Sequence, residues 1–84
     1  MPRALLLDVR TSGEFGGGHL PKARNIDFRS EAFGQEVDKL DKSKPVLIYC
    51  LSGGRSAQAA ELMRSKGFQV TELKGGYLKW TTKM

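Results

Sequence analysis

One cysteine and one histidine, Cys50 and His19, are all that the 84-residue sequence offers as sulfur and imidazole ligands. A single cysteine excludes an internal disulfide, and a single histidine leaves no second imidazole for a zinc pair. The acidic residues form no cluster along the sequence that would replace them as metal ligands. We therefore expect the protein to use neither a metal ion nor an organic cofactor.

The sequence also lacks a long hydrophobic run. Its longest apolar segments, residues 4–7 and 46–50, have the length of strands. They fall far short of the roughly 20 apolar residues that a membrane-spanning helix requires. Nothing at the N-terminus is typical of a signal peptide. These absences predict that the protein does not bind a membrane. They also predict that it resides in the cytoplasm, provided that no leader has been removed.

Acidic residues are in the minority. Nine Asp and Glu stand against fourteen Lys and Arg, which gives a formal net charge of +5. A basic surface attracts anions and speeds their encounter, but the same charge also serves simply to keep a protein soluble, and both interpretations stay open. The basic residues are scattered, with no aromatic stacking platform among them. We therefore do not expect nucleic-acid binding.

Strand-like and helix-like segments alternate along the chain. The expected strands span residues 4–9, 23–27, 45–50 and 68–73, and the expected helices span residues 13–15, 31–40, 55–66 and 77–81. This alternation predicts one α/β domain over residues 1–84 with a mainly parallel sheet. We expect Ser12 to cap the first helix, and Ala57, Ala60 and Met63 to face the sheet from the third.

Three polar or reactive residues lie at the ends of expected strands. Cys50 ends one strand, and Asp8 and Arg10 lie at the end of another. Parallel strands end at a common edge, where ligands bind in such sheets. We expect Asp8 and Arg10 to form an ion pair near that edge with a structural role, since structural ion pairs are more common than catalytic ones. His19 lies in an expected turn, and we assign it a structural role as well.

Cys50 opens a short glycine-containing loop, Cys-Leu-Ser-Gly-Gly-Arg-Ser, that leads into an expected helix. Unpaired N–H groups at the start of a helix, the positive end of its dipole and the nearby Arg55 all favour an anion. Such surroundings lower a thiol pKa from about 8.5 into the range of about 3.5–7.5. The alternative is an inert buried cysteine, which is common at strand ends. The loop favours a reactive thiolate.

Four segments in order resemble the rhodanese family, and together they cover nearly the whole chain. They are LLDVRTSGEF at residues 6–15, GHLPKA at 18–23 followed by Asn25 and Ile26, CLSGGRS at 50–56, and LKGGY at 73–77 with Trp80. The resemblance implies a three-layer fold with helices on both sides of the sheet. It also implies transfer of sulfane sulfur from a donor such as thiosulfate, through a persulfide on Cys50, to a thiophilic acceptor such as cyanide or a thiol.

The resemblance assigns roles to the residues of the loop. Cys50 is the implied nucleophile, and the cradle for the sulfur consists of Leu51, Ser52, Gly53, Gly54, Arg55 and Ser56. The implied partners are a small anionic donor and a thiophilic acceptor, which is either a small molecule or a protein. One alternative remains open, a sulfur-carrier or interaction module that relays persulfide sulfur between proteins.

Three further features refine the resemblance. Four residues separate Cys50 from Arg55, whereas related phosphatases and arsenate reductases have one more, and the shorter loop favours sulfur over phosphate. Lys22 stands where the family often has glycine. The helical segment that usually precedes the first strand is missing from the sequence, so an exposed sheet edge is expected. We expect a monomer or a weak homodimer.

Overall fold

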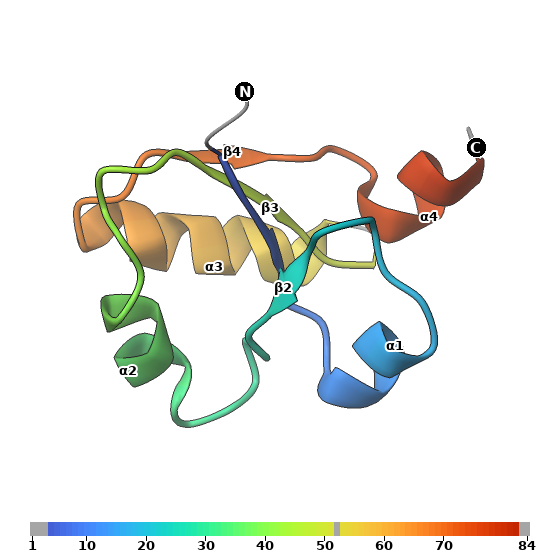
Figure 1. Cartoon of the computed structure of the whole chain (residues 1–84), viewed down its shortest axis with the longest axis horizontal. Coiled ribbons are helices and arrows are strands. Elements are labelled where there is room, and N and C mark those ends of the chain that lie inside the picture. The colour runs from blue at the N-terminus through green and yellow to red at the C-terminus, as the bar shows by residue number, and fades with distance from the viewer. Residues whose placement is uncertain (1–3, 52, 83–84) are drawn as a thin grey trace.

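Four parallel strands form the centre of the molecule. The computed structural model describes residues 4–51 and 53–82. The strands are β1 (Leu5–Asp8), β2 (Arg24–Asn25), β3 (Val46–Tyr49) and β4 (Val70–Glu72), in the spatial order β2-β1-β3-β4 (Figure 1). In the register, Asp8 of β1 lies beside Asn25 of β2 on one side and beside Tyr49 of β3 on the other. All the neighbouring strands are parallel, as the alternation of elements predicted.

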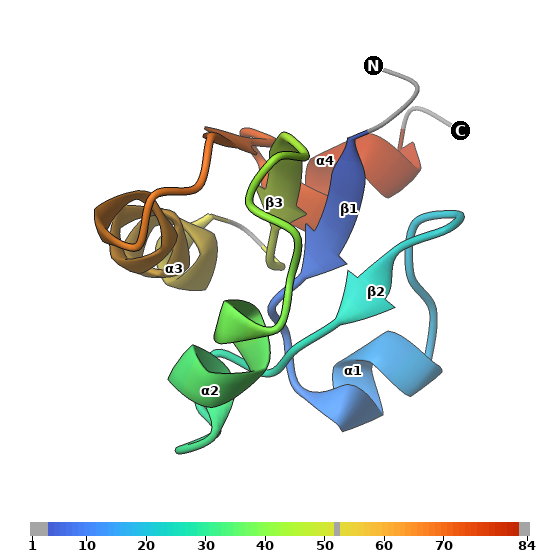
Figure 2. The same ribbon diagram turned by 60° about the vertical axis from the view of Figure 1, so that its left-hand side comes forward.

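Helices cover both faces of the sheet. They are α1 (Ser12–Gly16), α2 (Phe33–Asp38), α3 (Gly54–Ser65) and α4 (Gly76–Thr82). Figure 2 shows α2 and α3 on one side of the strands and α1 and α4 on the other. The three-layer α/β architecture is therefore confirmed. No helix within residues 4–51 and 53–82 is long and apolar enough to cross a bilayer.

The first helix is capped by a different residue from the one predicted. Thr11 is the N-cap, because its Oγ1 accepts a hydrogen bond from the Glu14 N–H at 3.2 Å and the Glu14 side chain accepts one from the Thr11 N–H at 3.0 Å. This reciprocal pair is a capping box. Ser12, the predicted cap, is already the first residue of α1.

One face of the sheet packs an apolar core. Side chains alternate between faces along a strand, so Leu7 and Val9 from the first strand segment join Val46, Ile48 and Cys50 from the third, all of them buried. Phe33 and Val37 from α2 and Ala59, Ala60 and Met63 from α3 belong to the same cluster. The stripe predicted on α3 was wrong at Ala57, which is exposed. Its place is taken by Ser56 and Ala59.

The opposite face is polar and aromatic. Asp8 and Arg10 are buried there as an ion pair, with Arg10 Nη2 at 2.7 Å from Asp8 Oδ2. The Arg10 side chain is 3 % exposed and the Asp8 side chain is 0 % exposed. The Arg10 guanidinium lies 4.1 Å from the ring centre of Tyr77, and Tyr77 stacks on Tyr49. Burial raises the pKa of Tyr49 to about 12, so this phenol stays neutral. It accepts a hydrogen bond from the Leu20 N–H at 3.1 Å.

Candidate active site

Cys50 directly follows β3 and is 1 % exposed. Its Sγ accepts a hydrogen bond from the Gly53 N–H at 3.1 Å, and its thiol points at Ser56 Oγ, 3.5 Å away. Ser56 Oγ in turn donates to the Gly53 carbonyl at 3.2 Å. The loop can curl back on the sulfur in this way because Gly53 adopts φ +126°, a conformation that side chains with a β-carbon rarely take.

These contacts suit a sulfur that becomes an anion. The Gly53 N–H already points at Sγ, and a serine hydroxyl can rotate to donate once the thiol has lost its proton. Gly53 is also the N-cap of α3, so the sulfur lies at the helix end that carries positive partial charge. The same groups would stabilise the terminal sulfur of a persulfide, which is likewise negatively charged.

The start of α4 holds the backbone of this loop. The Tyr77 N–H donates to the Cys50 carbonyl at 2.8 Å, and the Leu78 N–H donates to the Leu51 carbonyl at 3.1 Å. Gly76 makes the approach possible, because an added β-carbon would lie 2.5 Å from the Cys50 oxygen. Within a trans peptide the N–H points opposite to the C=O, and no described peptide bond is cis. The Leu51 N–H is therefore turned away from α4.

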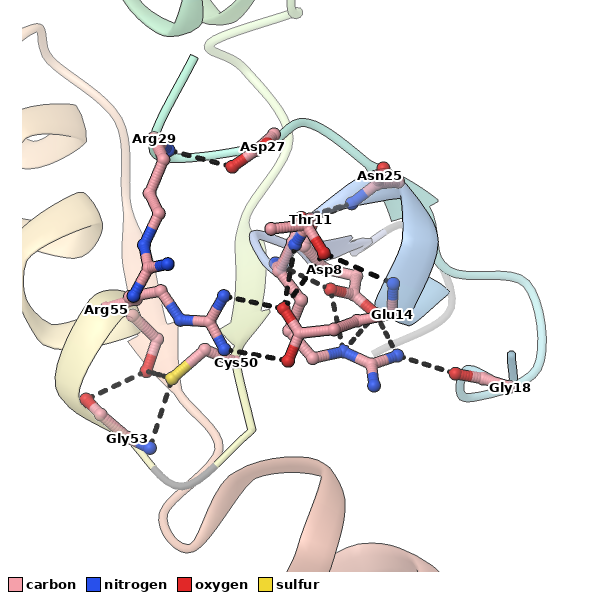
Figure 3. Close-up of polar contacts among 12 residues, drawn as sticks. Asp8, Thr11, Glu14, Gly18, Asn25, Asp27, Arg29, Cys50, Gly53 and Arg55 are labelled. Carbon is pink, nitrogen blue, oxygen red and sulfur yellow. Dashed lines mark hydrogen bonds and ion pairs between the residues drawn. The ribbon is translucent and has the colours of Figure 1, made fainter. Parts of the chain in front are cut away.

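Arg55 is paired with an acidic residue of the same chain. Its Nη1 and Nη2 donate to Glu14 Oε1 and Oε2 at 2.7 and 3.0 Å (Figure 3). The hydrogen bond from Arg55, followed by that from the Thr11 backbone, lowers the pKa of Glu14 to about 2. The Glu14 hydrogen bond is also the main cause that raises the pKa of Arg55. The positive charge beside the Cys50 loop is thus largely balanced from within the protein.

The structure places the remaining residues of the predicted cradle in different settings. Leu51 is half-buried and held by α4, while Gly54 is the exposed first residue of α3. Ser52 lies outside the described residues. Of the predicted cradle, Gly53 and Ser56 form hydrogen bonds with Sγ, and Arg55 lies at the same helix end.

The predicted ion pair of Asp8 and Arg10 is confirmed, and His19 contacts Phe15 of α1. Arg10 joins two parts of the fold, because Nη2 also donates to the Gly18 carbonyl at 2.6 Å. The His19 ring stacks on Phe15 with ring centres 3.8 Å apart, and its Nδ1 donates to the Phe15 carbonyl at 3.1 Å. Across the part of the chain that the structure describes, no three His, Cys, Asp or Glu residues lie together in a way that could hold a metal ion.

Sequence reasoning missed the two residues that support the loop from a distance. Glu14 could have been found, because Thr11 and Glu14 have the T-x-x-E spacing of a capping box. That spacing would still not have revealed its partner Arg55, which is 41 positions away. Gly76 is part of the LKGGY segment that follows an expected strand, but its close approach to the Cys50 carbonyl depends on how α4 folds back.

Comparison with known proteins agrees with this geometry. The family model described as "Rhodanese-like domain" matches residues 1–83. An uncharacterized protein of Bacillus subtilis, YqhL, is 40 % identical over 83 residues, which cover 98 % of this chain and 64 % of that protein. A sulfurtransferase of Allochromatium vinosum is 34 % identical over 77 residues, covering 90 % of this chain and 70 % of the relative.

A yeast protein and a solved crystal structure are also similar to this chain. A thiosulfate:glutathione sulfurtransferase of Saccharomyces cerevisiae is 31 % identical over 86 residues, covering 89 % of this chain and 62 % of that protein. The crystal structure of a rhodanese-related protein from Thermoplasma volcanium superposes with a TM-score of 0.88 at 26 % identity, covering 98 % of this chain and 80 % of the other. This chain thus spans about two thirds of the length of the curated relatives described here.

Proposed function

The chain belongs to the rhodanese-like sulfurtransferase family, and from that premise we propose that it moves sulfane sulfur from thiosulfate, through a persulfide on Cys50, to cyanide or a small thiol. The observation that carries the proposal is the setting of Cys50 Sγ, with the Gly53 N–H at 3.1 Å and Ser56 Oγ at 3.5 Å. The similarity to a thiosulfate:glutathione sulfurtransferase supports this choice of donor.

The reaction has two steps, and each forms one bond and breaks one. The Cys50 thiolate attacks the outer sulfur of thiosulfate, the S–S bond of thiosulfate breaks, and sulfite leaves with the electron pair. Cyanide then attacks the terminal sulfur of the persulfide, which releases thiocyanate and returns the thiolate. The Gly53 N–H and the start of α3 stabilise the negative sulfur before and after the first step.

The sequence provides no second thiol to discharge the persulfide, since Cys50 is the only cysteine. Persulfide sulfur is released when a thiolate or another nucleophile attacks it, so the acceptor must come from outside the chain. We propose a reducing compartment such as the cytoplasm, where small thiols are kept available, and a monomeric or weakly dimeric protein.

A sulfur relay between proteins is the second candidate. The observation that favours it is on α4, where Leu78 and Trp80 are 53 % and 40 % exposed although α4 is bonded to the Cys50 loop. Exposed apolar side chains contribute to protein contact sites where they form a contiguous patch. In this version Cys50 receives sulfur from a persulfidated protein rather than from thiosulfate.

Intact-protein mass spectrometry separates the two candidates. We expect the protein to gain one sulfur atom after incubation with thiosulfate, to lose it on addition of cyanide, and to gain none when Cys50→Ser replaces the wild type. A protein that stays unmodified in thiosulfate but accepts sulfur from a persulfidated protein donor would favour the relay. No gain from either source would reject sulfur transfer at Cys50.

A further inference from the structure

The segment that follows β2 carries a cation toward the Cys50 loop. Two backbone hydrogen bonds fasten this segment to the end of β1, from the Ile26 N–H to the Asp8 carbonyl at 3.0 Å and from the Phe28 N–H to the Val9 carbonyl at 3.1 Å. The next residue is Arg29. Figure 3 shows its side chain extending toward Arg55 and the Cys50 loop.

The Arg29 guanidinium is available in a way that the Arg55 guanidinium is not. Arg29 is exposed, and its backbone N–H is bonded to Asp27 Oδ1 at 2.8 Å. Among residues 4–51 and 53–82, no carboxylate lies within ion-pair distance of its side chain. Both terminal nitrogens of Arg55, in contrast, are engaged by Glu14. The cation near the loop that remains open to a ligand is therefore Arg29.

In a sulfur donor of the thiosulfate type, the charged sulfonyl oxygens lie at a fixed distance from the outer sulfur atom that is transferred. Its outer sulfur must reach Cys50 Sγ, which is buried, so the sulfonyl oxygens stay on the outer side of the loop. A planar guanidinium matches two such oxygens with parallel hydrogen bonds. Resting on the sulfur transfer proposed above, we propose that Arg29 binds the anionic sulfonyl end of the donor and thereby makes charged thiosulfonyl compounds the preferred donor class.

The same contact assists the first chemical step. When Cys50 attacks the outer sulfur and the S–S bond of the donor breaks, the electron pair goes to the departing sulfite. Negative charge thus grows on the group that Arg29 contacts, and a fixed positive charge at that position stabilises the leaving group. The nearby Asp27 and Glu14 carboxylates oppose this effect, but Glu14 is neutralised by Arg55.

The test compares two exposed arginines and two sulfur donors. The rate at which Cys50 gains sulfur is measured by mass spectrometry, without an acceptor, for the wild type, for Arg29→Gln and for Arg24→Gln. Arg24 is an exposed cation on the neighbouring strand β2 and serves as the control. The donors are thiosulfate and benzenethiosulfonate, in which an aryl group replaces one charged oxygen of the sulfonyl end.

We expect Arg29→Gln to lower the second-order loading rate with thiosulfate about tenfold, the lower end of what a hydrogen bond to a charged group contributes. Arg24→Gln should change it less than about twofold, as expected for a distant surface charge. The loss at Arg29 should shrink with benzenethiosulfonate. Wild-type loading rates in Arg29→Gln, or an equal loss of the loading rate in Arg24→Gln, would overturn the role of Arg29 and leave the proposed function standing. A wild-type protein that takes sulfur from neither donor would instead reject the proposed function.

Discussion

The Glu14 carboxylate accepts a hydrogen bond from each terminal nitrogen of Arg55, across 41 positions of the chain, at 2.7 and 3.0 Å. Glu14 thereby serves two elements, because the same carboxylate completes the capping box of α1. A cation in the first turn opposes the dipole of its own helix, so Arg55 is stabilised by an anionic partner. The structure supplies that anion from within the protein.

The Glu14–Arg55 pair should make stability depend on pH. The pKa of Glu14 falls from the ordinary 4.5 to about 2 on folding, so the ionised form favours the folded state. The stabilisation is complete above about pH 4.5 and is lost as the pH falls toward 2. We expect Glu14→Gln to lower the free energy of unfolding by about 1–2 kcal/mol at pH 7, as for a partly exposed bidentate pair, and by little near pH 2.

Urea unfolding at several pH values measures this difference. Glu61→Gln is the matched control, because Glu61 is exposed on α3. The variant at Glu61 should follow the wild type at every pH. A deficit of Glu14→Gln that stays constant down to pH 2 would show that the ion pair does not control it.

The Cys50 thiol should ionise below the value of about 8.5 for an ordinary cysteine. The Gly53 N–H points at Sγ, and the Ser56 hydroxyl lies within reach of it. The rate of alkylation as a function of pH gives the midpoint. Ser56→Ala should raise that midpoint, whereas Ser65→Ala, an exposed serine on the same helix, should leave it unchanged. A wild-type midpoint near 8.5 would contradict the role assigned to the loop.

Gly76→Ala should disrupt the contact between α4 and the Cys50 loop. Gly76 has φ +62°, and the added β-carbon would lie 2.5 Å from the Cys50 oxygen and 2.7 Å from the Leu51 oxygen. We expect a loss of about 2–4 kcal/mol in the free energy of unfolding, the range for a strained backbone position with a steric clash. Gly16→Ala on α1 meets no atom within 4 Å and should not destabilise. Equal stability of the two variants would refute the contact.

Lys22 holds a conformation that suits glycine better. Its φ of +67° places it in the left-handed region, where it is alone among the described residues other than glycine. That conformation costs a residue other than glycine about 1–2 kcal/mol. Glycine avoids this cost, but it also increases the conformational entropy of the unfolded chain, which offsets part of the gain in stability. We expect Lys22→Gly to stabilise the protein by about 0.5–1 kcal/mol, measured by thermal unfolding. Lys44→Gly, in another exposed turn, should lower stability instead.

Phosphate esters should be poor substrates. Four residues lie between Cys50 and Arg55, and Gly53 already curls back to 3.1 Å from Sγ, so the loop closes tightly around a single sulfur atom. We expect no aryl phosphate hydrolysis that disappears in Cys50→Ser. Hydrolysis that depends on Cys50 at a rate comparable to sulfur transfer would mean that the loop opens to admit a phosphate.

The sequence by itself determined the elements, their order and the nucleophile that we propose. Apolar runs of strand length alternating with helical segments were enough to predict a mainly parallel sheet, while the resemblance to a known family implied helices on both of its sides. Each expected element is found with shifted ends. The ends shift because pairing sets them. Of the expected strand at residues 23–27, only Arg24 and Asn25 pair with β1 as strand residues. Cys50 at a strand end was readable because strand, loop and helix follow one another directly along the chain.

Only the tertiary structure decided which groups surround that loop. The Glu14–Arg55 pair, the bonds from Tyr77 and Leu78 to the loop carbonyls, and the direction of Arg29 all join residues that are distant in sequence. Their proximity depends on how helices and loops pack against the two faces of the sheet. Local sequence patterns do not predict that packing. Local sequence sets backbone preferences over a few residues, whereas charge balance around a buried sulfur results from the whole fold.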